Sequence, residues 1–168
     1  SFPSKGQTAH GYLALPEGGN GPGIIVIQEW WGLTDHIRDV ADRLAAELGE
    51  SALPVELDVT SKTSIEEALA MLPQSWRQID VLINNAGLAL GTEPAHQAPL
   101  EDWETMIATN CKGLVTMTRA LLPAMVERGS GLVINLGSVA GHYPYPGGNV
   151  YGATKAFVEQ FTLNLRAD

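Results

Sequence analysis

Four short apolar runs, separated by helical patterns, constrain the fold of this chain more than any other feature. The runs are Gly23–Gln28, Val55–Val59, Val81–Asn84 and Leu132–Leu136. Each is short and rich in β-branched or aliphatic residues, which is typical of strands buried on both faces of a parallel sheet. The helical patterns cover 34–48, Ser64–Leu72, Leu100–Arg128 and Val150–Arg166. This β-α-β-α order predicts an α/β fold in which helices cover a mostly parallel sheet.

The residues before the first apolar run predict an antiparallel hairpin. Thr8–Leu15 alternates well enough to form a strand, and the Gly-Gln pair before it can turn it back on Phe2–Lys5. The longest predicted helix, Leu100–Arg128, has a signal at each end. Acidic residues begin it and Arg128-Gly129 ends it, which is the charge distribution that the helix dipole favours.

Charge and composition exclude several classes of function. A net charge of −9 argues against nucleic acid and anionic membrane as partners, because both need a basic face. No run of about 18 apolar residues is present, which argues against a membrane span. The one cysteine, Cys111, excludes an internal disulfide and fits a reducing compartment, so we expect a cytoplasmic protein. The histidines lack metal-ligand spacing, which predicts no metal site.

The chemistry-bearing residues of the second half have both a functional and a plain interpretation. Tyr151 and Lys155 are four residues apart, so on a helix they share one face and their side chains can meet. A nearby ammonium favours the phenolate, which makes the tyrosine a usable acid or base near neutral pH. Ser138 ends a predicted strand and can hold a substrate carbonyl there. The alternative is that these side chains are solvated polar groups.

From about Leu48 onward the chain resembles the short-chain dehydrogenase/reductase family. The resemblance rests on Asp58-Val59, Asn84-Asn85-Ala86-Gly87, Asn110 before Cys-Lys-Gly, Gly137-Ser138, and Tyr151-Gly-Ala-Thr-Lys155. The runs Ala86–His96 and Gly147–Phe157 look most like bacterial 3-hydroxy-acid (serine-type) dehydrogenases. The resemblance implies a catalytic tetrad of Asn110, Ser138, Tyr151 and Lys155, in which Asn110 completes a proton relay. It also implies that the adenosine side of the cofactor is lined by Asp58, Val59, Asn84, Ala86 and Gly87, although Asn-x-x-Gly is also ordinary turn chemistry.

The first 47 residues resemble a different family, the dienelactone hydrolases, which are α/β-hydrolases. The resemblance rests on Gly11–Pro16 and on the strand that leads into Gln28-Glu29-Trp30-Trp31-Gly32-Leu33. Glu29 matches a carboxylate near the nucleophile of that family, but the nucleophile elbow and the triad's Asp and His are missing. We interpret Cys111 as a packing residue rather than a nucleophile.

The two resemblances together predict a single chimeric domain over 1–168. It would join a hydrolase-like segment (1–47) to a truncated dehydrogenase segment (48–168) in a Rossmann-like and α/β-hydrolase-like hybrid. Combining the two topologies predicts a three-layer, six-stranded sheet with the hairpin outermost. Counted along the chain the order is 1-2-4-3-5-6, which puts Gly23–Gln28 between Val55–Val59 and Val81–Asn84, with right-handed crossovers.

The leading functional hypothesis from sequence is an engineered or recombined chimera without a complete active site, whose tetrad is vestigial. No cofactor is expected, because Glu29, Trp30 and Trp31 stand where a dinucleotide's pyrophosphate needs backbone N–H groups and glycines. The alternative is an NAD(P)-dependent oxidoreductase acting on small 3-hydroxy acids, and a weaker one is an esterase-like hydrolase. As a partner we expect a second copy of the chain, in a dimer or larger assembly with or without exchanged segments. Its contacts would be the helices at 100–128 and 150–166 and the exposed edge strand Leu132–Leu136.

Overall fold

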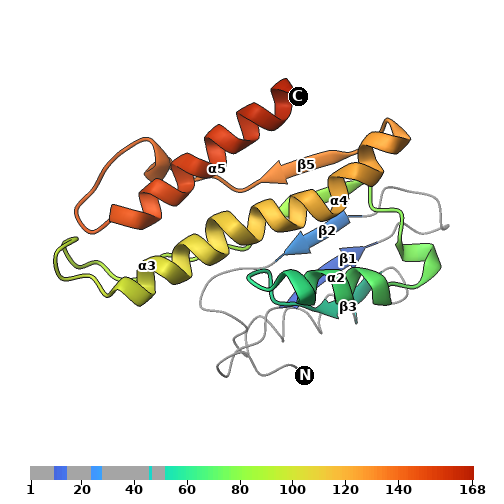
Figure 1. The fold of residues 1–168 in the computed structure, drawn as a ribbon, viewed down its shortest axis with the longest axis horizontal. Coiled ribbons are helices and arrows are strands. Elements are labelled where there is room, and N and C mark those ends of the chain that lie inside the picture. The colour runs from blue at the N-terminus through green and yellow to red at the C-terminus, as the bar shows by residue number, and fades with distance from the viewer. Residues whose placement is uncertain (1–9, 15–23, 28–45, 47–51) are drawn as a thin grey trace.

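The computed structural model describes residues 10–14, 24–27, 46 and 52–168, which contain a five-stranded sheet (Figure 1). The strands are β1 (His10–Ala14), β2 (Ile24–Ile27), β3 (Ala52–Glu56), β4 (Val81–Asn84) and β5 (Leu132–Asn135). Their order across the sheet is β3-β1-β2-β4-β5. β1 runs antiparallel to both of its neighbours, whereas β2, β4 and β5 are parallel. An α/β fold with a mostly parallel sheet is therefore confirmed.

The predicted strand order is wrong for two strands, because β1 and β3 are exchanged. β2 pairs with β4 as expected, but β1 lies between β2 and β3 and pushes β3 to the edge. Antiparallel pairing of β1 with β2 joins strands that are close in sequence, which keeps the entropy cost of closing the connection small. β3 also carries Pro54, and a proline is tolerated in an edge strand because it has no N–H to donate. The predicted outer strand Phe2–Lys5 and the helix predicted at 34–48, apart from Ala46, lie outside the described residues.

The helices follow the predicted ranges with one change. α2 (Lys62–Met71) begins at Ser61, whose Oγ accepts a hydrogen bond from the Ser64 N–H. The predicted long helix is observed as α3 (Leu100–Ile107), a π-helical turn at Ala108–Gly113, and α4 (Leu114–Arg128), which form one continuous rod (Figure 1). Gly129 ends this rod in the left-handed conformation (φ 65°), as predicted. α5 covers Asn149–Ala167. None of the described helices is long and apolar enough to cross a membrane.

The core of the described part lies between the sheet and the helices α2 and α4. Ile65 of α2, Leu82 of β4 and Met117 of α4 are completely or almost completely buried there. α2 packs against α4, and α5 packs against α3 and the π turn, so the helices lie side by side (Figure 1). The second helical layer of the predicted three-layer fold would rest on the segment 34–48, which the structure does not describe.

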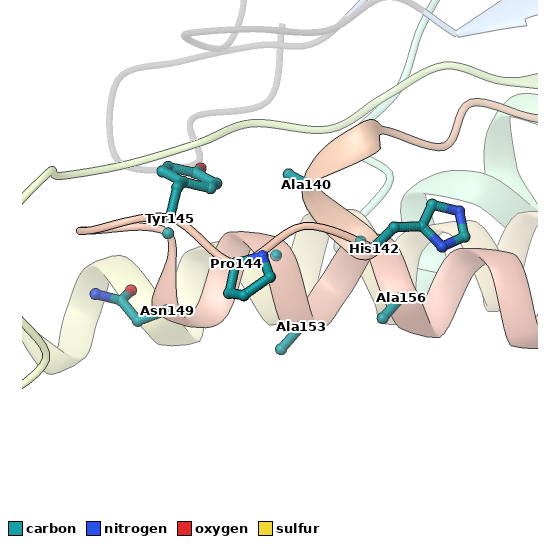
Figure 2. Close-up of a pocket in the computed structure, with 10 residues that line it drawn as sticks. Ala140, His142, Pro144, Tyr145, Asn149, Ala153 and Ala156 are labelled. Carbon is teal, nitrogen blue, oxygen red and sulfur yellow. The ribbon is translucent and has the colours of Figure 1, made fainter.

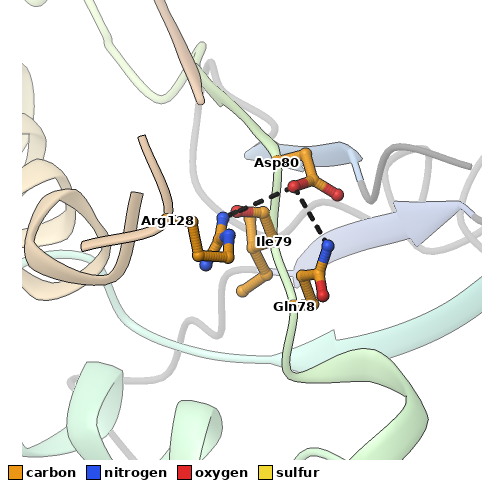
Figure 3. A network of polar contacts seen from close by, with 4 residues as sticks. All are labelled: Gln78, Ile79, Asp80 and Arg128. Carbon is orange, nitrogen blue, oxygen red and sulfur yellow. Dashed lines mark hydrogen bonds and ion pairs between the residues drawn. The ribbon is translucent and has the colours of Figure 1, made fainter. Parts of the chain in front are cut away.

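Two polar networks fix the position of α4 against the sheet. At the end of α4, Arg128 Nη2 donates to the carbonyl of Ile79 (2.7 Å) and lies 3.4 Å from Asp80 Oδ1, which also accepts from Gln78 Nε2 (Figure 3). This contact holds the end of α4 at the beginning of β4. The opposite end of α4, where the π turn joins it to α3, is therefore directed toward the carboxyl ends of the parallel strands.

The second network is a row of buried and half-buried side chains that joins α4, β4, β5 and α5. Asn84 Nδ2 donates to Thr118 Oγ1 (2.9 Å) and to Asn135 Oδ1 (2.8 Å). Asn135 Nδ2 then donates to Thr162 Oγ1 (2.9 Å). Hydrogen bonds of this kind are strengthened by the low dielectric of the interior and specify one arrangement of the elements. The row thus sets how far α4 and α5 extend past the strand ends, which is where the candidate site lies.

Candidate functional site

The carboxyl ends of β3, β4 and β5 meet at one edge of the sheet, because these strands run in the same direction. Asp58 follows β3, Gly87 follows β4 and Ser138 follows β5. The π turn and the first turns of α5 lie at the same edge. Open α/β sheets bind their ligands at such an edge, so the fold places the predicted site residues where a ligand would be expected.

Asn110 lies in the π turn and is fully buried. Its Oδ1 accepts from the Leu88 N–H (2.8 Å), and its Nδ2 donates to the Leu88 carbonyl (2.9 Å) and to Thr154 Oγ1 (3.0 Å). An amide nitrogen has two N–H groups, so both are engaged. Single π turns insert one extra residue into a helix, often at functional sites. The side chain of Asn110 therefore connects the loop after β4 to α5.

Lys155 is also buried, and its ammonium occupies the centre of the site. Nζ donates to the Leu136 carbonyl (2.9 Å) and lies 5.9 Å from the centroid of the Tyr151 ring. The spacing of these two residues had predicted that their side chains would meet. A Cβ on Gly87 would lie only 3.2 Å from Nζ and 3.3 Å from Asn110 Oδ1. Gly87 therefore brings the backbone after β4 directly against Lys155 and Asn110.

Ser138 begins a short turn that packs against the first half of α5. Its Oγ accepts from the Ala140 N–H (3.2 Å) and so caps the 3₁₀ turn η4 (Val139–Gly141). A Cβ on Gly152 would lie 2.8 Å from the Ala140 carbonyl oxygen, and a Cβ on Gly141 would lie 2.9 Å from the Ala156 nitrogen. These two glycines let the turn that carries Ser138 lie directly on the turn of α5 between Tyr151 and Lys155.

Two cavities border this part of the structure. One of ≈ 460 Å³ is lined by Ser138 and Lys155 together with residues of β5 and α5. The other, of ≈ 270 Å³, lies between α5 and the segment that follows η4, where Pro144 lies over the helix and Tyr145 points away from it (Figure 2). His142 lines both cavities, and its Nε2 lies 3.1 Å from Glu159 Oε2. The first cavity is the one that adjoins the predicted catalytic side chains.

The structure brings together some of the predicted cofactor-binding residues and not others. Gly87 lies beside Lys155, and buried Val59 packs close to Gly113 at the end of the π turn.

The other predicted cofactor-binding residues have structural contacts of their own. Asp58 Oδ1 accepts from the N–H and the hydroxyl of Thr60, at 2.8 and 2.7 Å, and so stabilises the turn into α2. Asn84 belongs to the buried row described above, and Ala86 packs partly buried against the core. Contact of these residues with a cofactor stays a prediction.

Glu29, Trp30 and Trp31, on which the expectation of an obstructed phosphate site rested, lie outside the described residues. Sequence reasoning also missed Thr154, Gly141 and Gly152. Thr154 lies three residues after Tyr151 in the same helix, and threonine hydroxyls commonly bond to carbonyls of the preceding turn, so its spacing was the available signal.

Cys111 reports on the charge of Lys155. The thiol is half-buried next to Asn110, and burial raises its pKa above the ordinary value while the positive charge of Lys155 lowers it. Burial disfavours the thiolate and a nearby ammonium favours it, so the two effects oppose each other. Because the chain has one cysteine, its reaction with an alkylating reagent can be followed without interference.

Replacing Lys155 with methionine is expected to raise the pKa of the Cys111 thiol further. The ammonium that favours the thiolate is lost while the burial that opposes it remains, so the midpoint of alkylation moves to higher pH. The rate of iodoacetamide alkylation measured against pH gives this midpoint. Lys112→Met is the matched control, because Lys112 is exposed and adjacent to Cys111 in sequence. An equal shift in both variants, or none in Lys155→Met, would contradict the placement of the ammonium.

Comparison with known proteins adds to this geometry. Residues 31–168 match the family model described as short chain dehydrogenase. The chain is 67% identical over 125 residues to the NADP-dependent 3-hydroxy acid dehydrogenase of Salmonella typhi. The aligned region covers 74% of this chain and 50% of that protein. It is 53% identical over 144 residues to the serine 3-dehydrogenase of Rhizobium radiobacter, covering 84% of this chain and 57% of the relative. The chain thus spans about half the length of the curated relatives it matches.

Solved structures give the same result. The closed form of serine dehydrogenase complexed with NADP+ matches with a TM-score of 0.72 and 60% identity, over 78% of this chain and 53% of that one. Serine dehydrogenase from Escherichia coli matches with a TM-score of 0.72 and 56% identity, over 83% of this chain and 62% of that one.

These comparisons correct two of the expectations from sequence. The expectation that no cofactor binds is overturned, because the matched relatives are named as NADP-dependent and a matched structure carries NADP+. The comparisons give no support to a segment derived from a hydrolase. The family match begins at Trp31, inside the range 1–47 that was assigned to the hydrolase, so the dehydrogenase likeness extends further toward the N-terminus than the motifs indicated.

Proposed function

The chain belongs to the short-chain dehydrogenase family, and we propose that it carries the catalytic residues of an NADP-dependent dehydrogenase for small 3-hydroxy acids. The observation that carries the proposal is the meeting of Tyr151, Lys155, Asn110 and the Ser138 turn at the carboxyl edge of the sheet. The high identity to named 3-hydroxy acid and serine dehydrogenases supports the substrate class. This proposal replaces the hypothesis of an inactive chimera.

The residues of the site have complementary roles in this reaction. NADP+, when bound, would supply the hydride acceptor for the carbon that bears the substrate hydroxyl. In its deprotonated form Tyr151 takes the proton of that hydroxyl as general base, and in the reverse direction its phenol returns a proton to the substrate oxygen. The Lys155 ammonium, held at the Leu136 carbonyl, stabilises negative charge that develops on the reacting oxygens. The Ser138 hydroxyl donates a hydrogen bond to the substrate oxygen.

The described residues fit a dinucleotide at one point in particular. Gly87 is buried, and a Cβ there would lie 3.2 Å from Lys155 Nζ and 3.3 Å from Asn110 Oδ1, closer than most Cβ contacts, so its backbone lies against the polar centre of the site. Glycine is the residue that permits a close approach of the backbone to a ligand. In this proposal Asp58 and Ala86 hold the nucleoside end, and Gly87, which lies beside Lys155, is the cofactor-binding residue nearest the reactive end.

Calorimetric titration with NADP+, followed by oxidation of serine or 3-hydroxypropionate, tests the proposal. We expect saturable binding and a rise in absorbance of reduced cofactor that depends on the hydroxy acid. An activated ester added to the same protein should remain uncleaved. Absence of NADP+ binding by folded protein would refute the proposed function, and ester cleavage would support the hydrolase alternative instead.

We also propose that the chain associates with a second copy of itself. Leu132 and Ile134 of β5 are 53% and 40% exposed at the edge of the sheet, and the Phe157 and Phe161 rings stack at 6.0 Å on α5. Unpaired strand edges and exposed apolar side chains favour association between chains. Light scattering is expected to give a mass of at least twice 17.9 kDa at micromolar concentration. A monomer mass across that range would contradict this.

A further inference from the structure

We propose that Thr154 is a positioning residue of this site, whose buried hydroxyl holds α5 against the π turn so that Tyr151 and Lys155 stay in place. The inference rests on the proposed function, because it assigns Thr154 a role toward the two catalytic side chains. Thr154 is 3% exposed and lies between Tyr151 and Lys155 in the sequence of α5. Its side chain faces the interior rather than the substrate, so it acts through its neighbours.

The Thr154 hydroxyl makes one hydrogen bond in each direction. It accepts from Asn110 Nδ2 at 3.0 Å and donates to the Tyr151 carbonyl at 2.8 Å. A hydroxyl has a single O–H, so donation to the carbonyl leaves only its lone pairs for Asn110. Both bonds are satisfied at once, which a valine of the same shape could not achieve.

The hydrogen bonds that lead from Leu88 through Asn110 and Thr154 to the Tyr151 carbonyl each have a fixed direction. The Leu88 N–H can only donate, so it requires Oδ1 of Asn110 on its side, at 2.8 Å. The amide nitrogen must then face the Leu88 carbonyl and Thr154. The hydroxyl of Thr154 completes the sequence at the Tyr151 carbonyl. Four elements of the site are thereby linked: the loop after β4, the π turn, the threonine, and the turn of α5 that begins at Tyr151.

Loss of the hydroxyl leaves a buried N–H of Asn110 without its acceptor. An unsatisfied buried donor is costly, so the amide or α5 must move to find another partner or water. Lys155 Nζ remains held at the Leu136 carbonyl. The π turn, with Asn110 and Cys111, and the first turn of α5, with Tyr151, would then both shift relative to the fixed ammonium. A misplacement of about 1 Å can lower a rate about 100-fold.

Thr118 provides a matched comparison within the same fold. It is 1% exposed, accepts from an asparagine amide at 2.9 Å and donates to the Leu114 carbonyl at 2.8 Å. Its hydrogen bonds have the same chemistry and burial as those of Thr154, but its asparagine, Asn84, leads along β4 and β5 instead of to Tyr151. Thr118→Val therefore measures the general cost of removing such a hydroxyl.

The test compares Thr154→Val, Thr154→Ser and Thr118→Val in the full chain with two readouts. The first is the pH midpoint of Cys111 alkylation, which needs no turnover and responds to the distance of the Lys155 charge. We expect Thr154→Val to move this midpoint to higher pH, and Thr154→Ser and Thr118→Val to leave it in place. The second is the rate of NADP+-dependent oxidation, where we expect Thr154→Val to lower kcat about 100-fold with little change in KM, and Thr154→Ser to restore kcat.

An unchanged thiol midpoint and unchanged kcat in Thr154→Val would overturn the proposal. So would a serine variant that behaves like the valine variant, or a Thr118→Val variant that shifts the midpoint equally, because either result would make the hydroxyl's effect a general loss of packing. If no form oxidises a hydroxy acid, the proposed function fails, and the thiol midpoints alone then decide the role of Thr154. Where Thr154→Val does not fold, Thr154→Ala removes the same hydroxyl from a smaller side chain.

Discussion

Replacing Tyr151 with phenylalanine is expected to lower kcat about 1000-fold, because it removes the group that exchanges a proton with the substrate hydroxyl. The substitution leaves the ring in place, so the contact between the ring and Lys155 Nζ, 5.9 Å from its centroid, persists. The hydrogen bond of Thr154 to the Tyr151 carbonyl involves the backbone and is also retained. The substitution should therefore lower the rate of the chemical step and leave the binding of NADP+ almost unchanged. We expect the dissociation constant for NADP+ to change by less than about threefold, which corresponds to about 0.7 kcal/mol.

The measurement is steady-state oxidation of a 3-hydroxy acid beside calorimetric titration with NADP+. Tyr143→Phe is a suitable control, because Tyr143 lies in the segment after η4 and is 73% exposed. Loss of turnover in both variants would indicate a general disturbance rather than loss of the group that accepts the proton. Retention of more than about a tenth of kcat by Tyr151→Phe would show that another group transfers the proton, and the catalytic assignment would be wrong.

Two of the strands were predictable from sequence because short runs of aliphatic and β-branched residues favour extended backbone, although β5 is more exposed than a strand buried on both faces. The bounds of β3 were predicted less well, because it covers Ala52–Glu56 and not Val55–Val59. The run Val81–Asn84 coincides with β4, and Leu132–Leu136 differs from β5 by one residue. The order of the strands was not predictable in the same way. It depends on which backbone pairs with β1, and the side-chain pattern of His10–Ala14 does not distinguish an outer strand from one inserted between β2 and β3.

In the site, too, contacts between neighbours on one helix were predictable from sequence, whereas contacts between distant residues were not. The spacing of Tyr151 and Lys155 predicted that they would meet, because neighbours on a helix are fixed by its geometry. The π turn at Ala108–Gly113 was read as part of one continuous helix, since one extra residue barely disturbs an apolar pattern. The contacts of Asn110 with Leu88 and Thr154 join residues far apart in sequence, and periodicity carries no information about them.

The second large effect is expected from Gly152→Ala, and its sign depends on two opposing contributions. In an unpacked helix, alanine is more favourable than glycine by about 1 kcal/mol. Here the new Cβ would lie 2.8 Å from the Ala140 carbonyl oxygen, which is closer than side-chain carbons normally approach. The Cβ is fixed to the backbone of α5 and the Ala140 oxygen is itself a backbone atom, so neither can rotate away, and α5 must separate from the turn that carries Ser138. Overpacking of this kind typically costs about 1–3 kcal/mol, which outweighs the gain in propensity.

The same displacement should lower kcat/KM for the hydroxy acid about 100-fold, because Ser138 lies on the moved turn and Tyr151 directly precedes the substituted residue. Urea unfolding followed by circular dichroism gives the stability, and Gly137→Ala is the control, since a Cβ there meets no atom within 4 Å. We expect the control to change the free energy of unfolding by less than about 0.5 kcal/mol. If Gly152→Ala were instead more stable and as active as the original protein, the η4 turn would be able to move away from the new Cβ without loss of stability or activity. The close contact of η4 with α5 would then have no part in holding Ser138 beside Tyr151.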